Sequence, residues 1–565
     1  MTLLDLRTAF GEVSHDLISK ALAMHKIPQH IIDLISNIYQ SANVAISVNN
    51  NITDPIRVRR GVLQGDPCSP LLFNICFNIL IRTIAQDKFK TLGFAWGPST
   101  NPCATSWLQF ADDSALISHD CKSAQSLVDI TAAWCKWSNM FLRPEKCVTF
   151  GMAKIKGVYD QFEPKLYIEG MQIPSVKTGA SFKYLGKLFS FSLDNLEIKE
   201  QLITKLNSLV EKISNLKISI QTKLKIVRHY IPSQLNFELR LYSLSHTWII
   251  NELDSIITKK IQTWLQYPIN TCVAEIAQLP LSHGGLGIPS LKTISEKQRL
   301  SVRSGLRDNS DPSIQLLWTE TSSKNIPIDS LLNNSNYLDA RRTLNQQSIS
   351  RSLNHVNSLE TQGPLISAIN TELKKQEIKR WSNFTLALPE GVFKFARKAL
   401  QQQLATAANM KRWGRSADNV CTLCKSVQTN KHVLSNCSSP GPLSRYSKRH
   451  NSVLTILVEY LTSVLPSSNT LYVDLPHRTP ISTIFHTLRP DLVVHHNNKI
   501  MVLELTVCHE TNFTAARERK ISKYCNLKNY LVPPFLSQNL IFSTVEVSVL
   551  GFIADLNPLC KLLNL

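Results

Sequence analysis

The sequence lacks any long apolar run. It contains no stretch of the roughly eighteen apolar residues that a membrane-spanning helix needs, and no secretory signal peptide at its start. These absences exclude a signal-directed secreted protein and one that crosses a membrane on an apolar helix, so we expect no membrane partner. Acidic residues are also scarce, because 42 Asp and Glu stand against 62 Lys and Arg, for a net charge of +20. Such a surplus predicts a polyanionic partner, and nucleic acid is the default.

The cysteines are not accompanied by a signal that would direct the protein to an oxidising compartment. Thirteen are present, but without a secretory signal they are expected to be reduced thiols or metal ligands rather than disulfides. The chain has 565 residues and is 43% apolar. That length predicts about three or four domains, each with a packed core.

Two nearby segments carry the strongest chemical signal. Residues 60–73 read Arg-Gly-Val-Leu-Gln-Gly-Asp-Pro-Cys-Ser-Pro-Leu-Leu-Phe, and Asp112-Asp113 follow Phe-Ala at 110–111. Short apolar strands are predicted on either side of the aspartates, with a tight turn that projects both carboxylates. Because side chains alternate along an extended segment, we expect Asp112 to ligate a metal directly and Asp113 to support it. Phosphoryl transfer with two Mg²⁺ ions needs such clustered carboxylates.

A further carboxylate comes from the N-terminal segment Leu-Leu-Asp-Leu-Arg-Thr-Ala-Phe, residues 3–10. Asp5 would end a short apolar strand and ligate the metal. Taken alone, Asp5 could equally cap a following helix. Beside the two other motifs, the catalytic interpretation is favoured.

Together these motifs resemble the reverse transcriptases of non-LTR retrotransposons of the site-specific, ribosomal-DNA type. The resemblance implies that Asp5, Asp112 and Asp113 catalyse RNA-directed DNA polymerisation. It implies that Phe10 crowds the sugar 2′ position and selects deoxynucleotides, although Gly11 stands where the family usually has Asp. The loop residues expected to contact template and nucleotide are Arg60, Gln64 and Gly65. Residues 134–150, 182–186 and 284–288 resemble further elements of the family, the second of which grips the primer end.

The same resemblance indicates a missing part. Met1 lies four residues before Asp5, so the fingers region that normally precedes this aspartate is absent. We therefore expect an N-terminally truncated chain: a fragment, a mis-called start or a degenerate copy. Two function hypotheses follow. One is an active enzyme that combines an RNA-directed DNA polymerase with a DNA nuclease, and the other is a polymerisation-incompetent remnant that binds nucleic acid.

The middle of the chain is predicted to be helical. Residues 191–300 are expected to form the thumb that clamps the primer–template duplex, although a generic amphipathic helix with a solvated basic face explains the pattern equally well. Residues 301–400 are expected to form a helical connector, loosely ordered over 320–375 with only short helices. The apolar stripe behind the thumb assignment is Leu202, Leu206, Leu209, Ile213 and Leu216.

A compact set of metal ligands lies in residues 401–440. Its pattern is Cys421-x2-Cys424-x7-His432-x4-Cys437, which suits a tetrahedral Zn²⁺ ion. A knuckle this small has almost no core, so the metal would supply most of its folding free energy. The spacing also follows the polymerase in the elements that the chain resembles. Whether the knuckle binds nucleic acid or spaces its neighbours stays open, with binding slightly favoured.

The last signal lies in residues 441–540. Pro490-Asp491 is followed after twelve residues by Glu504-Leu505-Thr506, and Glu504 would face a site while the neighbouring leucines face a core. In this order after a knuckle, the segment resembles a restriction-like endonuclease in which Asp491 and Glu504 hold Mg²⁺. Thr506 stands at the usual lysine position. The resemblance implies that the catalytic lysine has moved to the next helix, where Lys520 is the candidate.

Further residues support the nuclease interpretation. Lys523 and Tyr524 are expected beside Lys520, and Arg-His-Asn at 449–451 resembles another element of that nuclease. Without the preceding motifs, the Pro-Asp and Glu pattern would indicate only a turn. Residues 541–565 are expected to be a separate C-terminal segment.

The predicted fold is therefore α+β and multidomain: a right-hand polymerase palm over 1–190, a helical thumb, a zinc knuckle and an α/β restriction-like nuclease. In the family that the chain resembles, the nuclease nicks target DNA and the freed 3′ hydroxyl primes reverse transcription of the element's RNA. The implied partners are template RNA, target DNA with its primer, and deoxynucleoside triphosphates. The implied location is the nucleus, where integration occurs.

Overall fold

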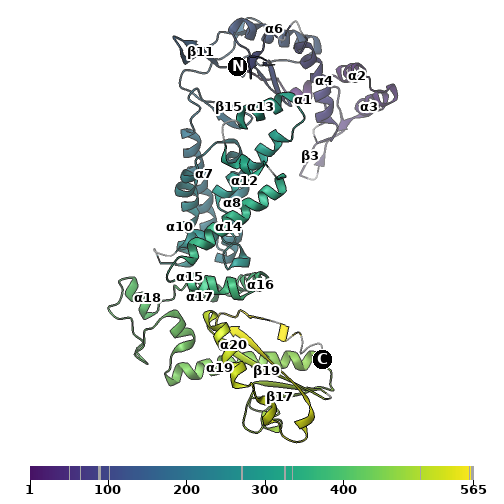
Figure 1. The fold of residues 1–565 in the computed structure, drawn as a ribbon. Coiled ribbons are helices and arrows are strands. Elements are labelled where there is room, and N and C mark those ends of the chain that lie inside the picture. Colours follow the sequence, from purple (N-terminus) through teal and green to yellow (C-terminus); the bar gives the residue numbers. More distant parts are fainter. Residues whose placement is uncertain are drawn as a thin grey trace. The chain divides into compact units, whose positions relative to one another are not determined.

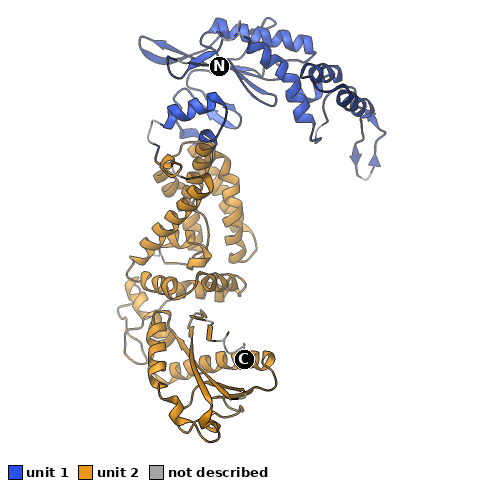
Figure 2. Cartoon of the chain, turned by 45° about the vertical axis from the view of Figure 1, so that its right-hand side comes forward, with its two compact units in different colours: residues 1–198, 305–326 blue, residues 199–304, 327–565 orange. Residues whose placement is uncertain are grey.

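A computed structural model describes residues 1–565 apart from 50, 64, 87–88, 90, 101, 269–271, 323–325, 334, 497, 556, 559 and 561–565. The described residues form two compact units (Figure 2). The first contains residues 1–198 and 305–326, and the second contains residues 199–304 and 327–565. Among the described residues, no helix combines the length and the apolar character needed to cross a membrane.

The first unit is built on an antiparallel four-stranded sheet with the order β10-β1-β9-β8. Its strands are β1 (Thr2–Leu4), β8 (Trp107–Phe110), β9 (Asp113–Leu116) and β10 (Val148–Thr149). Three helices share one apolar core with this sheet: α2 (His15–Met24), α4 (Ser69–Ile84) and α6 (Cys121–Ser138). The register places Leu4 opposite Ser114 and Phe110 opposite Asp113.

Smaller elements surround this core. Among the described residues of 1–198, this unit also contains the helices α1 (Ala9–Glu12) and α3 (Gln29–Ser41). The paired short strands are β2 (Asn43–Val44) with β5 (Ile56–Arg57), β3 (Ser47–Val48) with β4 (Asn51–Ile52), β6 (Phe94–Trp96) with β7 (Cys103–Thr105), β11 (Gly151–Ile155) with β12 (Val158–Phe162), β13 (Tyr167–Ile168) with β14 (Met171–Gln172), and β15 (Phe182–Tyr184) with β16 (Lys187–Phe189).

Helix α13 (Pro312–Ser322) belongs to the first unit, although the sequence predicts it within the connector. The Cys103 thiol donates a hydrogen bond to Ser313 Oγ over 3.5 Å. The Leu316 side chain also lies against Gly97, 2.8 Å from where a Cβ of that residue would be. These contacts pair segments about 200 residues apart, and sequence spacing does not reveal such pairs.

The second unit begins with helices in the segment where the sequence predicts a thumb. Leu202, Leu206 and Ile213 are buried as the spacing predicts, but Leu216 lies beyond the end of α7 and is exposed. The helices of this region are α7 (Leu196–Asn215), α8 (Ile220–Leu241), α9 (His246–Trp248), α10 (Ser255–Leu265), α11 (Val273–Gln278) and α12 (Leu291–Arg307).

The connector is more ordered than the sequence predicts. Helix α14 (Tyr337–Asn357) is 21 residues long, which corrects the expectation of short helices in a loosely ordered segment. Ala340, Leu344 and Val356 anchor its buried face, and the Ser and Gln residues that suggested disorder mostly occupy its other faces. The helices that follow are α15 (Gly363–Glu372), α16 (Lys375–Thr385), α17 (Glu390–Leu400) and α18 (Ala407–Arg412).

The glycine-rich stretch at 284–288 is a packing element in this unit. A Cβ on Gly285 would lie 1.9 Å from the carbonyl oxygen of Leu279, so no larger residue fits there. The buried Arg397 guanidinium donates to the carbonyl oxygens of Gly284 and Gly285 over 3.2 and 3.3 Å. The stretch therefore joins α11 to α17.

A second four-stranded sheet, with the order β17-β18-β19-β20, lies near the C-terminus (Figure 1). Its strands are β17 (Thr470–Val473), β18 (Leu492–His496), β19 (Lys499–Cys508) and β20 (Asn539–Ser548). Leu503 and Leu505 pack with α19 (Pro440–Val464), as the predicted alternation requires. Val502, on the opposite face, packs with Tyr524, which follows α20 (Phe513–Lys523).

Strand β20 corrects the boundary predicted at residue 540. It pairs in parallel with β19 along its whole length, with Glu504 opposite Thr544 and Thr506 opposite Glu546. A parallel partner needs a long crossover, which here includes α20. The sheet therefore extends to Ser548, inside the segment predicted to be separate.

Candidate active sites

The three predicted polymerase aspartates lie around the junction of β1, β8 and β9. Asp5 directly follows β1, and the pairing of Leu4 with Ser114 leads it towards Asp113. Asp112 occupies the two-residue turn between β8 and β9, which Ala111 closes with a left-handed φ of 53°. The Gln109 side chain supports that turn, because it donates to the Ala111 carbonyl oxygen and accepts from Ser114 Oγ.

These carboxylates share one electrostatic field. Burial raises the pKa of Asp113, and the neighbouring charges of Asp112 and Asp5 raise it further. Arg143 pairs with Asp5 through its Nε atom and offsets part of the charge. The carboxylate oxygens do not converge on one point: among the described residues, only two other groups bring three or more ligand atoms within 4.8 Å of one another. Carboxylate oxygens are the kind of hard donor that Mg²⁺ prefers.

The predicted nucleotide-site residues have mixed surroundings. Phe10 stacks on Phe73 with ring centroids 4.4 Å apart, which fixes its ring on α4. Gly65 is exposed, with a φ of +92°, and Gln64 lies outside the described residues. Arg60 is held within the protein, because it donates to the carbonyl oxygens of Glu12 and Asn139 over 2.8 and 3.0 Å. The Arg60 guanidinium therefore holds the loop that begins at Arg60 against these two carbonyl groups.

Close backbone packing joins the segment around Gly11 to the loop that begins at Arg60, and it restricts Gly61 rather than Gly11, where a Cβ would meet only Thr8 Cβ at 3.9 Å. The Gly61 N–H donates to the Val13 carbonyl oxygen over 2.7 Å, and the Val62 N–H donates to that of Phe10 over 2.8 Å. A Cβ on Gly61, whose φ is +86°, would lie 2.7 Å from the Gly11 carbonyl oxygen. The loop thus docks directly on the segment after Asp5.

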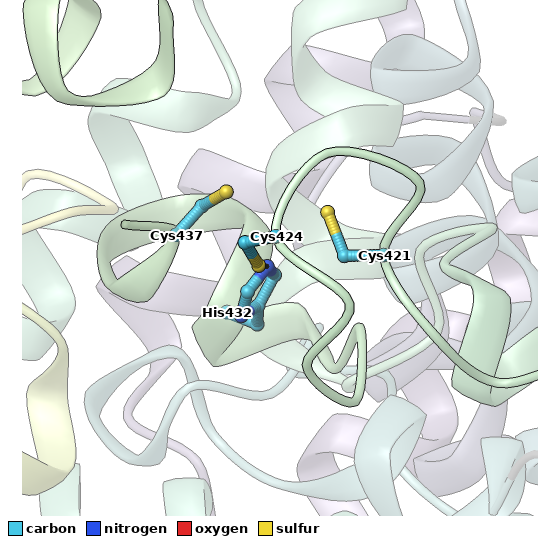
Figure 3. Close-up of side chains that lie close together, drawn as sticks. All are labelled: Cys421, Cys424, His432 and Cys437. Atoms are coloured by element: carbon cyan, nitrogen blue, oxygen red, sulfur yellow. Dashed lines mark hydrogen bonds between the residues drawn. The ribbon is translucent and has the colours of Figure 1, made fainter. Parts of the chain in front are cut away.

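The four predicted zinc ligands come together in the second unit (Figure 3). Their ligand atoms all lie within 4.8 Å of one another, and Cys424 Sγ is 3.4 Å from His432 Nε2. Cys421, Cys437 and His432 are buried, so water does not compete freely for them. Three cysteine thiolates and one histidine imidazole form a donor set that fits tetrahedral Zn²⁺.

Local geometry prepares the first thiolate. Lys425 adopts a left-handed φ of 64°, and its N–H donates to the Cys421 carbonyl oxygen over 2.9 Å, which closes the turn between the first two cysteines. Hydrogen bonds from the backbone N–H groups of Cys424 and Leu423 lower the pKa of Cys421 to about 6. A thiolate is the form that binds metal.

The predicted nuclease carboxylates meet across β18 and β19. The Asp491 N–H donates to Glu504 Oε2 over 3.0 Å, and the Leu505 N–H donates to Asp491 Oδ2 over 2.8 Å. Glu504 is only 1% exposed. Burial raises its pKa, and the charge of Asp491 raises it further. Two crowded carboxylates of this kind gain from a nearby cation.

Helix α20 supplies that cation. Lys520 Nζ pairs directly with Glu504 Oε1, while Thr506, at the usual lysine position, keeps a buried Oγ1 without a hydrogen-bond partner among the described residues. Tyr524 donates to the Arg489 carbonyl oxygen over 3.0 Å, and Lys523 lies 3.0 Å from its hydroxyl. The predicted group of Lys520, Lys523 and Tyr524 is therefore assembled at one place.

His450 closes the other side of the pair. Its Nε2 lies 3.5 Å from Asp491 Oδ1 and donates to the Leu505 carbonyl oxygen over 3.2 Å. The hydrogen bond to Asp491 raises the pKa of His450 to about 9, so the ring is a cation at neutral pH. The Arg-His-Asn segment thus reaches the carboxylates from α19.

Sequence reasoning missed two ion pairs at these sites. Arg143 is distant in sequence from Asp5, so nothing in the local pattern links them. Arg517 donates to Glu546 Oε2 over 3.1 and 3.0 Å, and Glu546 is 1% exposed. One signal was available: Glu546 stands between Val545 and Val547 in an alternating strand segment, where a lone acid indicates a paired or functional position.

Comparison with known proteins finds a family match within the first unit. Residues 1–188 match the family described as reverse transcriptase (RNA-dependent DNA polymerase). This part of the chain is a reverse transcriptase domain. The sheet that carries Asp5, Asp112 and Asp113 lies within the matched range and is its polymerase palm.

The chain is also similar to Pol polyproteins of R2-type retrotransposable elements. The chain is 28% identical over 309 residues to the Pol polyprotein of the type-2 element R2DM of Drosophila melanogaster, covering 54% of this chain and 28% of that protein. It is 23% identical over 586 residues to a type-1 element R2 Pol polyprotein of Popillia japonica, covering 100% and 89%. A Nasonia vitripennis R2 polyprotein is 25% identical over 296 residues, covering 52% and 27%. The chain thus spans about a quarter of the length of the first and third relatives, and these similarities support the predicted reverse transcriptase of this element class.

Proposed function

We propose that this chain couples RNA-directed DNA polymerisation to DNA nicking, so that a nicked target strand primes reverse transcription of a template RNA. The observation that carries the proposal is the group of Asp491, Glu504 and Lys520, assembled in the same chain as a reverse transcriptase domain. The surplus of 62 basic over 42 acidic residues supports nucleic-acid partners.

In the polymerase site, Asp5, Asp112 and Asp113 would hold Mg²⁺. When bound, the ions neutralise charge on the attacking and leaving oxygens of the nucleotidyl transfer. Phe10, fixed by its stack on Phe73, would limit space at the sugar 2′ position. The hairpin of β15 and β16 would hold the primer end. Burial raises the pKa of Tyr184 in that hairpin and the charge of Asp113 raises it further, which supports the closeness of Tyr184 to the site.

In the nuclease site, Asp491 and Glu504 would hold a divalent ion that supplies Lewis acidity when bound. Lys520 would then leave Glu504 and stabilise the charge that develops on the scissile phosphate. His450, held between Asp491 and the Leu505 carbonyl oxygen, would orient the Asp491 carboxylate. Nicking frees the 3′ hydroxyl that the polymerase extends with deoxynucleoside triphosphates.

The knuckle would bind one structural Zn²⁺ through Cys421, Cys424, His432 and Cys437. Tyr446 of α19 supports this role, because its hydroxyl donates to the Val433 carbonyl oxygen over 2.9 Å inside the same turn. Lys431 Nζ donates to Asn512 Oδ1 over 2.9 Å, which ties the knuckle to the segment before α20. The metal would thus brace the nuclease as well as the knuckle.

Two assays on the full chain test the coupled function. Supercoiled plasmid with Mg²⁺ reports nicking, and an RNA template with a DNA primer reports extension. Asp491→Ala should abolish nicking and spare extension, and Asp112→Ala should do the reverse while RNA binding persists. A wild-type chain that binds primer–template but does not extend it would instead favour the binding remnant. Such an enzyme would act in the nucleus, where its target DNA lies.

A further inference from the structure

A second group of potential metal ligands lies far from the knuckle in sequence. It consists of Cys272 at the start of α11, Glu275 within α11 and His355 near the end of α14. Their ligand atoms all lie within 4.8 Å of one another. The Cys272 thiol donates to Glu275 Oε2 over 2.7 Å, and His355 Nε2 lies 3.7 Å from Glu275 Oε1.

Helix geometry explains only half of this arrangement. A residue at the helix start and another three positions later meet routinely, so the contact of Cys272 with Glu275 alone would be an ordinary contact within one helical turn. His355 is 80 residues further along the chain and comes from another helix. A soft thiol, a carboxylate and an imidazole gathered from two elements form a donor set typical of zinc.

The distances also suit one ion. Tetrahedral zinc with bonds of about 2.0 to 2.3 Å places neighbouring ligand atoms about 3.5 Å apart. The distance from Cys272 Sγ to Glu275 Oε2 is 2.7 Å, and that from His355 Nε2 to Glu275 Oε1 is 3.7 Å. Both lie within 1 Å of that spacing, so adjustment of the side chains is enough to bind one ion. Glu275 and His355 also line a cavity of about 310 Å³, which leaves one coordination position open to solvent.

We propose that Cys272, Glu275 and His355 form a second zinc site, with water or an exogenous anion as the fourth ligand. Lys292 and Arg351 line the same cavity and would favour an anion there. The bound ion would fasten the start of α11 to the end of α14 and so cross-link the thumb helices to the connector. This proposal does not depend on nuclease or polymerase activity.

Metal content of the purified full chain tests the proposal directly. After dialysis against zinc-buffered solution, the wild type should hold two Zn²⁺ per chain, whereas Cys272→Ser and His355→Ala should each hold one. Cys424→Ser, in the knuckle, should also hold one, and Cys424→Ser combined with His355→Ala should hold none. Matched controls are Cys525→Ser and His229→Ala, which remove exposed residues outside both ligand groups and should keep two.

A rescue variant separates metal binding from a merely structural contact. His355→Cys retains a zinc ligand, so it should restore the second ion that His355→Ala loses. Cobalt-substituted protein should show thiolate-to-metal absorption from both sites, reduced in Cys272→Ser. One zinc in the wild type, or two in both Cys272→Ser and His355→Ala, would leave only the contact within one helical turn and overturn the proposal.

Discussion

The palm and the C-terminal sheet each present clustered carboxylates, but they differ in how the negative charge is compensated. In the palm, the Asp5 side chain is 35% exposed and Asp112 lies on a turn, with Arg143 as the paired cation. In the C-terminal sheet, the Glu504 side chain is 2% exposed and contacts Lys520, while His450 contacts Asp491. The first site is open, and the second is closed by its own cations.

This difference follows from the two folds. A hairpin turn projects side chains beyond the sheet, where a long duplex can approach them. Strand β19 lies inside a sheet with helices on both faces, so its buried carboxylates require paired charges in the absence of a metal. Under the proposed function, the palm would rely on bound ions to bring its carboxylates together, whereas Lys520 and His450 already hold Glu504 and Asp491 in the proposed nuclease site.

The largest expected effects separate the two sites. Asp112→Ala should remove all measurable primer extension without changing plasmid nicking, because a metal ligand on the turn is lost. Asp491→Ala should remove nicking without changing extension. Asp129→Ala and Glu518→Ala, at exposed positions of the same two regions, are matched controls that should change neither activity. Loss of both activities in either site variant would contradict two independent sites.

Lys520 tests whether the closed site works through its relocated cation. Lys520→Ala should lower the nicking rate by about 10²- to 10³-fold, because one charge-stabilising donor is lost. Arg519→Ala removes the same charge from an exposed position one residue earlier and should have no such effect. Thr506→Lys added to Lys520→Ala should partly restore nicking. Normal nicking by Lys520→Ala would move the role to Lys523.

Acid stability should also distinguish the C-terminal region. Burial, assisted by the charge of Lys431, lowers the pKa of His509 to about 4. The unfolded chain binds a proton there below about pH 6.5 and the folded chain does not, so stability is full above that pH and falls as the pH drops towards 4. At pH 5 the loss should be about 2 kcal/mol.

The variant His509→Asn isolates the contribution of His509 to the acid-induced loss of stability. His509 accepts from the Thr511 N–H at a helix start, and Asn can accept the same bond. Urea unfolding at pH 7 and pH 5 should show a smaller acid-induced loss in His509→Asn than in wild type, while His229→Asn, at an exposed position, should behave as wild type. Equal losses in all three proteins would show that His509 titrates normally.

Local patterns predicted most of both sites, and long-range pairing explains what they missed. The turn at Asp112, the alternation around Glu504 and the zinc ligand spacing depend on neighbours within a few residues, and the structure contains the turn, the alternation and the gathered ligands. The partner of Asp5 is Arg143, 138 residues away, which no periodicity encodes. Strand β20 was overlooked because a parallel strand is recognised only through its partner.

The connector shows the limit of composition. Residues 320–375 are rich in Ser, Asn and Gln, yet α14 forms because three apolar anchors, Ala340, Leu344 and Val356, are buried. Val356 belongs to the core that also contains Phe513 and Phe552. Helical order there comes from tertiary packing, which outweighs weak intrinsic propensity.

The smallest expected effect concerns Arg517, one turn before Lys520 on α20. Glu546 holds Nε and Nη2 of Arg517, and the Arg517 side chain is still 37% exposed. The pair lies beside Thr506, because Glu546 is the register partner of that residue on β20. If Lys520 serves a DNA phosphate as proposed, the remaining N–H donors of Arg517 would be available to a neighbouring phosphate.

Arg517→Gln should weaken DNA binding by about tenfold, since a charged hydrogen bond contributes roughly 1.5 kcal/mol. It should also reduce the slope of log affinity against log salt by about 1, while the nicking rate at saturating DNA changes little. Glu546→Gln should produce a weaker form of the same change, because Arg517 loses its anchor but keeps its charge. Arg519→Gln is the matched control. If Arg517→Gln lowers the saturated nicking rate as strongly as Lys520→Ala, Arg517 acts on the reacting phosphate itself, and the cation of the closed site is shared between two side chains.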